Sequence, residues 1–346
     1  MEIMATKKKI LVTGSEGYIG STLVKKLLQR KVPFDGLDTA FYGKNIQRKK
    51  YTLIQKDLRN IKDIDFAPYS SIIHLAALSN DPMGELNPGL TEEINYKATV
   101  ALAKKAKEQG VKRFIFSSSC SIYGIAENGI VNEKSKTNPL TAYAKSKIAV
   151  ENALIELADN DFCVCLLRNS TVYGYSPSFR NDLVVNNLTS CVYATNKIKM
   201  MSDGTPWRPL IDVRDLSDIF IAFIKARAQK VNKQIFNIGF DENNFQVKQI
   251  TEYIQKYLKN SEVEFTGEHG KDTRSYKVDF SKFKKAFPQI KKKWPIDKSI
   301  KDLLVQLKKI NFTKNEFLTN KYARITILKQ LLDEKLVDNN LFWKIK

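Results

Sequence analysis

The sequence predicts an α/β protein whose ligand site lies at one edge of a doubly wound parallel sheet. Three observations lead to this fold class. Short apolar runs alternate with helical stretches from residue 10 to about residue 168, a glycine-rich turn follows the first run, and the alternation loosens after Gly174. Strands linked by right-handed helical crossovers are parallel, so their carboxyl ends share one edge, where ligands bind.

Six apolar runs are the expected strands of this sheet: 10–12, 34–37, 52–54, 71–75, 113–117 and 162–167. Helices are expected between them, most clearly over 20–30, 95–109 and 143–158. A further helix over 215–228 and a strand over 234–239 are expected to return to the sheet. Residues 1–174, completed by about 213–240, should therefore form one large domain.

The other segments predict a smaller mixed α/β lobe for substrate, from 175–212 and 241–300, and a helical C-terminal extension over 301–346. Residues 175–187 and 200–212 are rich in Pro, Gly, Asn and Asp, and are expected as loops around one helix. In the extension, Thr313 and Glu316 have capping-box spacing. The extension also contains an apolar stripe at helical spacing, which consists of Ile325, Leu328, Leu331, Leu332 and Leu336. We expect this stripe to pack on the chain itself and not to recruit a partner.

The composition is ordinary for a globular protein, with 43% hydrophobic and 27% charged residues. No apolar run approaches the roughly 18 residues that span a bilayer, so a cytoplasmic protein without a membrane partner is expected. The net charge of +20 makes nucleic acid one candidate partner. Because the basic residues are scattered and not interleaved with stacking aromatics, a lysine-rich surface is favoured instead. No CxxC pair occurs among the four cysteines, so no zinc or other metal site is expected.

Gly14, Gly17 and Gly20 form a G-x-x-G-x-x-G turn between the first strand and its helix. The first glycine permits the tight turn, the second lets backbone amides approach a pyrophosphate, and the third lets helix and strand pack closely. Asp38 ends the next strand, where a carboxylate can bind the hydroxyls of an adenosine ribose. The next three residues, 39–41, include no arginine that could hold a 2′-phosphate. The sheet is therefore expected to be Rossmann-type and to bind NAD in preference to NADP.

Tyr143 and Lys147 form a YxxxK pattern on an expected helix, with a serine cluster upstream. Oxidation of an alcohol needs a base for the hydroxyl proton while hydride leaves to nicotinamide. A tyrosine of ordinary pKa, about 10, is too weakly ionised for this at neutral pH. A lysine ammonium one helical turn away, together with the nicotinamide cation, can lower that pKa. The pattern predicts a hydride-transfer site, in which a serine hydroxyl would orient the reacting oxygen.

With these motifs, the sequence resembles the extended short-chain dehydrogenase/reductases, in particular the nucleotide-sugar epimerase/dehydratase group typified by UDP-galactose 4-epimerase. The resemblance covers about residues 8–300 and depends on several motifs in the same order. They are 13–20, Asp38, 57–58, 74–77, Asn95, 116–124, 143–147, 203–205, Arg208 and 213–215.

The resemblance implies a role for each matching residue. Asp57 and Leu58 would flank the adenine, and Asn95 would brace the structure beside the cofactor. The other implied cofactor contacts are Tyr18, Ile19, Leu75, Ala76, Ala77 and Ser117, in addition to the glycines, Asp38, Tyr143 and Lys147. Ser119, Tyr143 and Lys147 would be the catalytic triad. The implied substrate contacts are Ser121, Thr171, Arg208 and Arg274, with Arg208 gripping the nucleotide diphosphate. A homodimer through helices 95–109 and 143–158 is also implied.

The departures from the family pattern narrow the chemistry. Related sugar 4,6-dehydratases have Asp-Glu directly after the catalytic Ser or Thr, where this chain has Cys120 and Ser121. Without a carboxylate there, elimination has no acid/base pair, which leaves oxidation, reduction or C4 epimerisation. Cys120 acting as an acid is the alternative to its simple packing. Thr171 and Asp212 also stand where the family has Asn and His or Tyr, and His74 is expected to be structural.

We therefore expect an NAD-dependent oxidoreductase or epimerase that acts on a nucleotide-linked sugar, oxidised at C4 with Tyr143 as the base. Within the same class, the alternative is a nucleotide-sugar 4-dehydrogenase or 4-ketoreductase that releases its product without epimerisation. From another class, the alternative is a non-catalytic cofactor-sensing or nucleic-acid-binding regulator of the same fold. The identity of the nucleotide and the sugar is left open.

Overall fold

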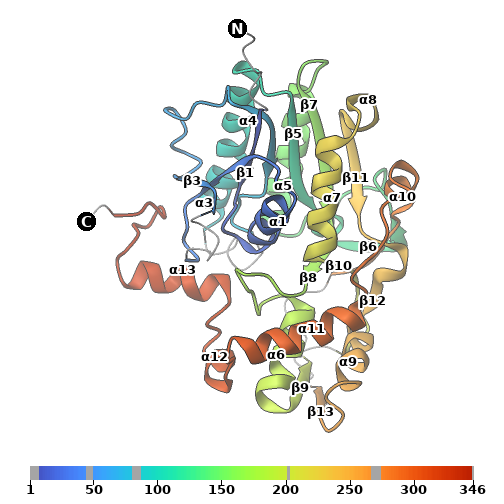
Figure 1. Ribbon diagram of the computed structural model, residues 1–346. Helices are drawn as coiled ribbons and strands as arrows, with labels where there is room; N and C mark the ends of the chain where they lie inside the picture. Colours follow the sequence, from blue (N-terminus) through green and yellow to red (C-terminus); the bar gives the residue numbers. More distant parts are fainter. Residues whose placement is uncertain (1–7, 44–49, 80–86, 201–202, 266–273, 345–346) are drawn as a thin grey trace.

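The computed structural model describes residues 8–43, 50–79, 87–200, 203–265 and 274–344. Its centre is a seven-stranded sheet in the order β3-β2-β1-β4-β5-β7-β11, in which every neighbouring pair is parallel (Figure 1). This confirms the predicted fold class. The strands are β1 (Lys9–Thr13), β2 (Phe34–Asp38), β3 (Thr52–Gln55), β4 (Tyr69–His74), β5 (Arg113–Ser119), β7 (Cys163–Asn169) and β11 (Gln234–Ile238).

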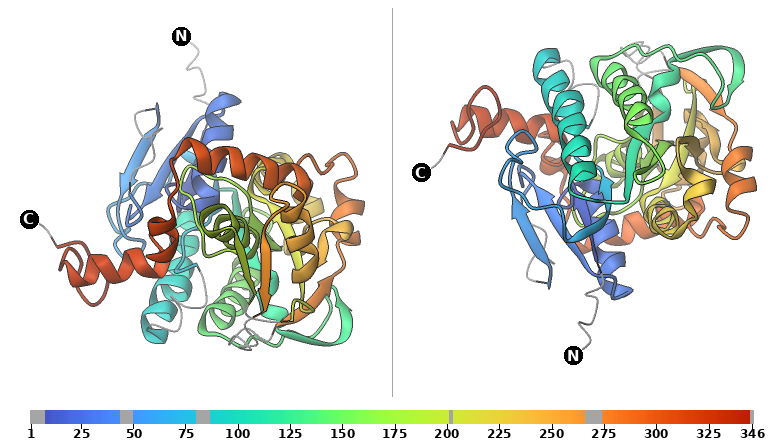
Figure 2. Two further views of the ribbon diagram at one scale, coloured as in Figure 1. Left: turned by 90° about the horizontal axis from the view of Figure 1, so that it is seen from below. Right: turned by 90° about the horizontal axis from the view of Figure 1, so that it is seen from above.

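Helices cover both faces of the sheet (Figures 1 and 2). On one face, Leu23, Val24 and Leu27 of α1 pack with Phe220 and other side chains of α7. On the other face, α4 and α5 bury a second apolar cluster against the strands. Each large apolar side chain buried in this way contributes about 1.5–3 kcal/mol to folding. The helices are α1 (Tyr18–Gln29), α7 (Val213–Lys225), α4 (Ala98–Glu108) and α5 (Ala142–Leu157).

Two segments differ from the sequence-based expectation. The helix expected over 95–109 is not uniform, because a π-helical turn, η2 (Glu92–Lys97), lies between α3 (Pro88–Thr91) and α4. The expectation of a loop over 200–212 was wrong in its second half, where β10 (Trp207–Asp212) pairs with β8 (Thr171–Tyr173) and β12 (Asn244–Gln246). Pro209 lacks a donor and makes this stretch resemble a loop, whereas pairing with distant segments makes it a strand.

The smaller lobe lies below the carboxyl edge of the sheet in Figure 1. It contains the sheets β12-β10-β8 and β13-β9, and a further pair, β14-β6, lies beside them. Its core joins Tyr173, Leu210, Ile250 and Ile300. The other elements of the chain before the C-terminal extension, in the lobe and elsewhere, are η3 (Cys120–Tyr123), β6 (Ile125–Val131), α6 (Val184–Thr195), β9 (Lys197–Met200), α8 (Ala228–Val231), η4 (Asp241–Asn243), α9 (Val247–Gln255), β13 (Glu262–Phe265), β14 (Ser275–Val278) and α10 (Ser281–Ala286).

The C-terminal extension is helical, as expected, but it is divided into α11 (Ile296–Lys309), α12 (Lys314–Leu318) and α13 (Arg324–Asp333). The predicted capping box forms: the Glu316 amide donates to Thr313 Oγ1 at 3.2 Å, and the Thr313 amide donates to Glu316 Oε2 at 3.0 Å. In α13, Leu328 and Leu331 are buried against Phe41 and Leu90. The apolar stripe therefore packs on the chain itself.

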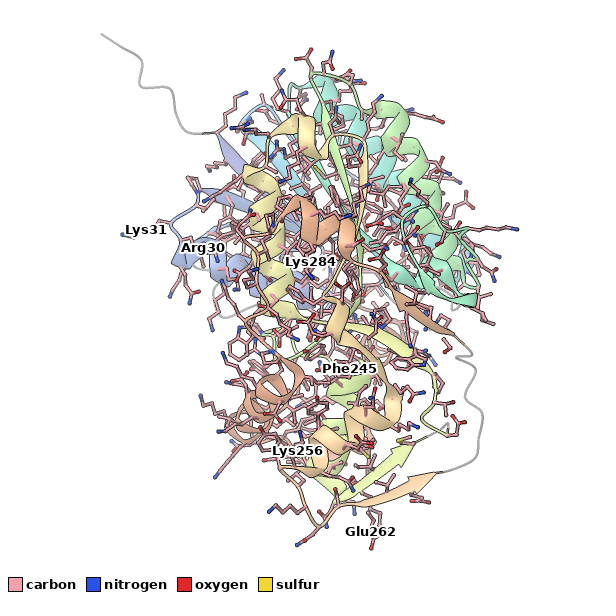
Figure 3. All side chains as sticks on the ribbon, turned by 90° about the vertical axis from the view of Figure 1, so that its right-hand side faces the viewer. Arg30, Lys31, Phe245, Lys256, Glu262 and Lys284 are labelled. Atoms are coloured by element: carbon pink, nitrogen blue, oxygen red, sulfur yellow. The ribbon has the colours of Figure 1, made fainter. Side chains whose placement is uncertain are left out.

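Basic side chains of the described residues occur on several different elements. Figure 3 shows Lys31, Lys284 and Lys256 well separated along one side of the molecule, on segments that follow or belong to different helices. None of the helices within the described ranges has the length and apolarity needed to cross a bilayer.

Candidate active site

A cavity of about 1030 Å³ runs along the carboxyl edge of the central sheet. Of the site residues proposed from the sequence, all but Asn95 line it. They are Gly14, Gly17, Tyr18, Ile19, Gly20, Asp38, Asp57, Leu58, Leu75, Ala76, Ala77, Ser117, Ser119, Ser121, Tyr143, Lys147, Thr171, Arg208 and Arg274.

The glycine turn forms a cradle that no side chain could share. Gly14 has φ +73°, and a Cβ at this position would lie 2.7 Å from the backbone nitrogen of Ala76. A Cβ on Gly20 would lie 1.9 Å from the carbonyl oxygen of Gly14. Gly17 is the N-cap of α1 and gives no side-chain cap, so the first amides of this helix can serve an anion.

Asp38 ends β2 beside this cradle. Its Oδ2 accepts a hydrogen bond from the Glu16 amide at 2.9 Å, and its Oδ1 accepts one from the Ala40 amide at 2.7 Å. Burial raises the pKa of Asp38 to about 6, so the group is still mostly ionised at neutral pH. A side-chain-free turn, a helix N-terminus and a fixed carboxylate acceptor fit the pyrophosphate and the ribose of a dinucleotide.

Asp57 and Leu58 follow β3 on the same half of the cavity. The carboxylate of Asp57 accepts three hydrogen bonds from Arg59, each at 2.8 Å, two from the guanidinium and one from the backbone amide. Asp57 is therefore held in place by its neighbour, and both residues border the region expected to hold the adenine.

Two buried polar residues hold the cavity wall from behind. Asn95 exchanges hydrogen bonds with the backbone of Leu78, at 2.8 and 3.1 Å, and thereby fixes the loop after β4. It braces the site, as the resemblance implied, but it is not at the cavity surface. His74 lies between the hydroxyls of Thr13 and Thr99, each at 2.8 Å. Burial, helped by the charge of Lys147, lowers the pKa of His74 to about 3, so this histidine is neutral and structural.

Tyr143 and Lys147 lie in the first turns of α5, which begins where the Thr141 hydroxyl accepts a hydrogen bond from the Ala144 amide at 3.2 Å. Lys147 Nζ lies 5.4 Å from the centre of the Tyr143 ring and donates to the Ser117 carbonyl at 2.8 Å. Burial lowers the pKa of Lys147 to about 7, and Glu151 partly opposes this shift. At neutral pH the lysine therefore carries a proton, and with it a positive charge next to the tyrosine, in about half of the molecules.

The serines after β5 also face the cavity. The Ser119 hydroxyl donates to Ser121 Oγ at 2.9 Å and accepts from the Ser121 amide at 3.1 Å. Between them, Cys120 is only 1% exposed and its Sγ donates to the Arg168 carbonyl at 3.1 Å. Burial raises the pKa of the Cys120 thiol. Cys120 is therefore a packed residue and does not reach the cavity.

A buried ion pair supports this part of the site. Arg168 Nη2 and Glu151 Oε2 are 2.7 Å apart and join β7 to α5. Next to them, Asn169 Nδ2 donates to Ser117 Oγ at 2.8 Å, while the Asn169 Oδ1 atom is buried and has no hydrogen-bond partner. Asn169 lines the cavity, so this acceptor is an addition to the site that the sequence did not predict.

Residues of three separate segments form the opposite half of the cavity. Thr171 is on β8, Arg208 is on β10, and Arg274 directly precedes β14. Arg208 Nη1 donates to the carbonyl of Arg274, which brings the two arginines together. Asp212, in contrast, caps α7 by accepting from the Arg214 amide at 2.8 Å and is wholly buried. Asp212, which stands where the family has His or Tyr, therefore has a structural role.

Further cavity residues carry no sequence signal. Arg180 and Asp182 lie in the segment before α6, and Arg324 is the first residue of α13. The first two stand in a stretch that the sequence marks only as a loop, and Arg324 lies in the extension outside the family motifs. Only the folded arrangement brings them to the cofactor half.

Comparison with known proteins agrees with this geometry. The model of the NAD dependent epimerase/dehydratase family matches residues 10–239. A UDP-glucuronate 4-epimerase of Thermodesulfobacterium geofontis is 28% identical over 294 residues, which are 80% of this chain and 88% of the relative.

Solved structures show the same fold. A UDP-glucose 4-epimerase of Thermotoga maritima with UDP-glucose superimposes with a TM-score of 0.79 at 22% identity, covering 88% of this chain and 99% of that one. An NAD-dependent NDP-hexosamine 5,6-dehydratase of tunicamycin biosynthesis has a TM-score of 0.78 at 21% identity, covering 88% and 98%.

Proposed function

The chain belongs to the NAD-dependent epimerase/dehydratase family, and on this premise we propose that it inverts the C4 hydroxyl of a UDP-linked hexose. As a member it is an NAD-dependent enzyme of nucleotide-sugar chemistry. The observation that carries the proposal is the convergence of Ser119, Tyr143 and Lys147 on the cavity that also holds the glycine cradle and Asp38.

The acidic residues of the cavity support epimerisation over dehydration. Among the described residues that line it, these are Asp38, Asp57 and Asp182. Asp38 and Asp57 belong to the cofactor half, and Asp182 is paired with Arg180 at 2.8 Å. Positions 120 and 121 supply a buried thiol and a hydroxyl, so no carboxylate stands there to deprotonate and protonate the sugar during loss of water.

The side chains divide the reaction between them. Tyr143 takes the proton of the C4 hydroxyl and later returns it, with the positive charge of Lys147 favouring the ionised phenol. Ser119 donates a hydrogen bond to the reacting oxygen and fixes its position. The bound cofactor supplies the chemistry of accepting a hydride from C4 and giving it back. Inversion at C4 would require the 4-keto sugar to turn within the cavity before it is reduced again.

The choice of a UDP sugar is supported by the relatives and by two cations. The relative named above is a UDP-glucuronate 4-epimerase, and a Bacillus subtilis UDP-glucose 4-epimerase is 29% identical over 259 residues. Arg208 and Arg274 lie together on the half opposite the glycine turn, and guanidinium groups suit a diphosphate.

The test is to incubate the purified protein with UDP-glucose, UDP-galactose, UDP-glucuronate and UDP-N-acetylglucosamine, separately, in D₂O. We expect one pair to interconvert without change of mass, and without deuterium at C4, because the hydride comes from the sugar itself. Loss of two hydrogens with reduction of NAD⁺ would instead identify a 4-dehydrogenase, and conversion only of a 4-keto sugar supplied together with NADH would identify a ketoreductase. Loss of water would identify a dehydratase.

The regulator alternative makes a different prediction. A non-catalytic nucleic-acid-binding protein would bind RNA or DNA without cofactor and lose affinity steeply with salt. A mobility-shift titration at two salt concentrations, next to the sugar panel, separates the two classes.

Two further features belong to the proposal. We propose a homodimer through α4 and α5, which lie side by side on one face of the sheet (Figure 2). Light scattering after size exclusion tests the homodimer, and a monomer would contradict it.

A cytoplasmic location is supported by the four cysteines, which are free thiols.

A further inference from the structure

The C-terminal segment, here residues 313–344, is fastened to the cofactor half of the molecule. Trp343 Nε1 donates to the carbonyl of Thr39 at 2.7 Å, directly after β2. The Phe342 ring lies 3.7 Å from the guanidinium carbon of Arg59, after β3. Leu328 of α13 is buried against residues of α3 and η2, and Figure 1 shows α13 next to this end of the sheet. The segment therefore forms a fixed wall of the cofactor half.

This wall carries a buried arginine whose charge is not paired. Arg324 is 3% exposed, yet it lines the cavity. Its Nη2 donates to the carbonyl and the hydroxyl of Ser178, at 2.9 and 2.6 Å, and its guanidinium lies 4.1 Å from the centre of the Tyr42 ring. Across the described residues it makes no ion pair within 4 Å, and its Nε and Nη1 donors have no partner. A buried cation in this situation is costly unless an anion joins it.

A second arginine stands beside it. Arg180 is 6% exposed, forms an ion pair with Asp182 at 2.8 Å and donates through Nη1 to Ser79 Oγ at 3.3 Å. The backbone amide of Arg324 contacts the same Asp182 at 3.4 Å. Of the two guanidinium groups, only that of Arg180 is paired with this carboxylate. Burial, followed by the repulsion from Arg180, lowers the pKa of Arg324 to about 10, and the weaker influences of Tyr42, Asp182 and Asp38 act in the opposite direction.

The neighbours of this pair identify the half of the cavity that it serves. Arg324 interacts electrostatically with Asp38 and Tyr42, and Arg180 does so with Tyr18, the first residue of the helix that begins at the glycine turn. Ser79 follows Ala76 and Ala77 after β4. All of these belong to the cofactor half, whereas Arg208 and Arg274 lie together in the lobe half.

We propose that Arg324, with Arg180 beside it, binds the diphosphate of NAD from the side opposite the glycine turn. The turn offers backbone amides and a helix N-terminus to one side of this group, and the guanidinium of Arg324 offers its positive charge and its Nε and Nη1 donors to the other. The C-terminal segment is in this way part of the cofactor site. The inference requires NAD as the cofactor and does not depend on the proposed C4 chemistry.

The test is calorimetric titration of the full chain, freed of bound nucleotide, with NAD⁺, ADP, UDP and adenosine. For Arg324→Gln we expect affinity for NAD⁺ and ADP to fall by about 10- to 100-fold, the usual loss for a hydrogen bond to a charged group, with adenosine and UDP unchanged. The matched control is Lys329→Gln, which makes the same charge change at an exposed position of the same helix and should bind all four ligands normally.

Each other outcome overturns the proposal. Unchanged affinity for NAD⁺ and ADP removes Arg324 from the site, and an equal loss for adenosine makes its role structural. A loss confined to UDP places it at the substrate diphosphate. Should Arg324→Gln fail to fold, Arg324→Lys keeps the charge but loses the fork. We then expect a several-fold loss for NAD⁺ and ADP only, and equal affinity overturns the proposal as well. Because no arm measures turnover, failure of the proposed reaction leaves these results independent.

Discussion

The two halves of the cavity are built in different ways. In the cofactor half, the glycine turn and Asp38 follow directly from neighbouring strands, so a few residues of local sequence fix their positions. In the substrate half, Thr171, Arg208 and Arg274 come from three segments that are far apart in the chain. The glycine turn therefore needs only one strand–turn–helix unit, whereas the placement of Thr171, Arg208 and Arg274 depends on how the lobe packs against the sheet.

We expect the largest effect on turnover from a substitution of Tyr143, at the junction of the two halves. For Tyr143→Phe we expect turnover to fall by about 10²- to 10⁴-fold, because the acid/base group is lost, while affinity for NAD⁺ and for the sugar nucleotide is kept. Steady-state rates and calorimetric titration measure this. Tyr253→Phe, on α9 in the lobe, is the control and should be fully active. Preserved turnover in Tyr143→Phe would remove this residue from the mechanism.

Gly20→Ala should break the cofactor half alone. The new Cβ would lie 1.9 Å from the Gly14 carbonyl oxygen, so the turn must shift. We expect a stability loss of about 1–3 kcal/mol or more and a large loss of NAD⁺ affinity. Urea unfolding and cofactor titration check both. In Gly89→Ala the nearest atom would be Asn87 Oδ1 at 3.5 Å, an ordinary contact, so this control should behave as the unaltered protein. Normal NAD⁺ binding by Gly20→Ala would refute the packing argument.

Arg208→Gln should break the substrate half alone. We expect KM for the sugar nucleotide to rise by about 10- to 100-fold with NAD⁺ affinity unchanged, since one charged donor to the diphosphate is lost. Arg227→Gln removes the same charge from an exposed position before α8 and should leave KM as it was. Equal weakening of NAD⁺ and substrate would mean that the two halves do not act separately.

Lys147 makes stability depend on pH. Its folded pKa of about 7 lies below the ordinary 10.5, so between these values the unfolded chain binds more protons than the folded one. The contribution of Lys147 to the free energy of unfolding therefore rises with pH between about 7 and 10.5, and it is lowest below pH 7. Lys147→Met should flatten the slope by up to about 1.4 kcal/mol per pH unit, measured by urea unfolding at two pH values in the window. Lys145→Met, exposed on the same helix, should leave it unchanged. Identical slopes for the Lys147 variant would contradict the burial argument.

Cys120→Ala should have the smallest effect. Its thiol lies beneath the junction and donates to the Arg168 carbonyl, away from the cavity. We expect normal turnover and a stability loss of about 1 kcal/mol, typical of a single core substitution. Cys191→Ala, at a buried site in the lobe, should give a similar pair of results. A collapse of turnover in Cys120→Ala alone would restore the cysteine as an acid.

Sequence patterns were most informative where the chemistry is local. The turn around Gly14 and the Tyr143–Lys147 pair each lie within one strand–turn–helix unit or one helix, so spacing alone identifies them. Sequence patterns say less about contacts between distant segments. For Asn95 the resemblance implied a bracing role beside the cofactor, and the structure adds its partner, the backbone of Leu78. The strand at 207–212 was missed, because its pairing partners are β8 and β12.

The parallel sheet, the glycine turn and the Tyr143–Lys147 pair can be predicted from the primary structure, because the periods of apolar residues and the glycine spacing act over short stretches. That Arg324, about 300 residues from the glycine turn, lines the same cavity follows from the folded arrangement. The apolar face of α13 must be buried somewhere, and it fits the surface formed by Phe41, Leu78 and Leu90. That packing brings a buried charge to the cavity, and no local pattern around Arg324 could have indicated it.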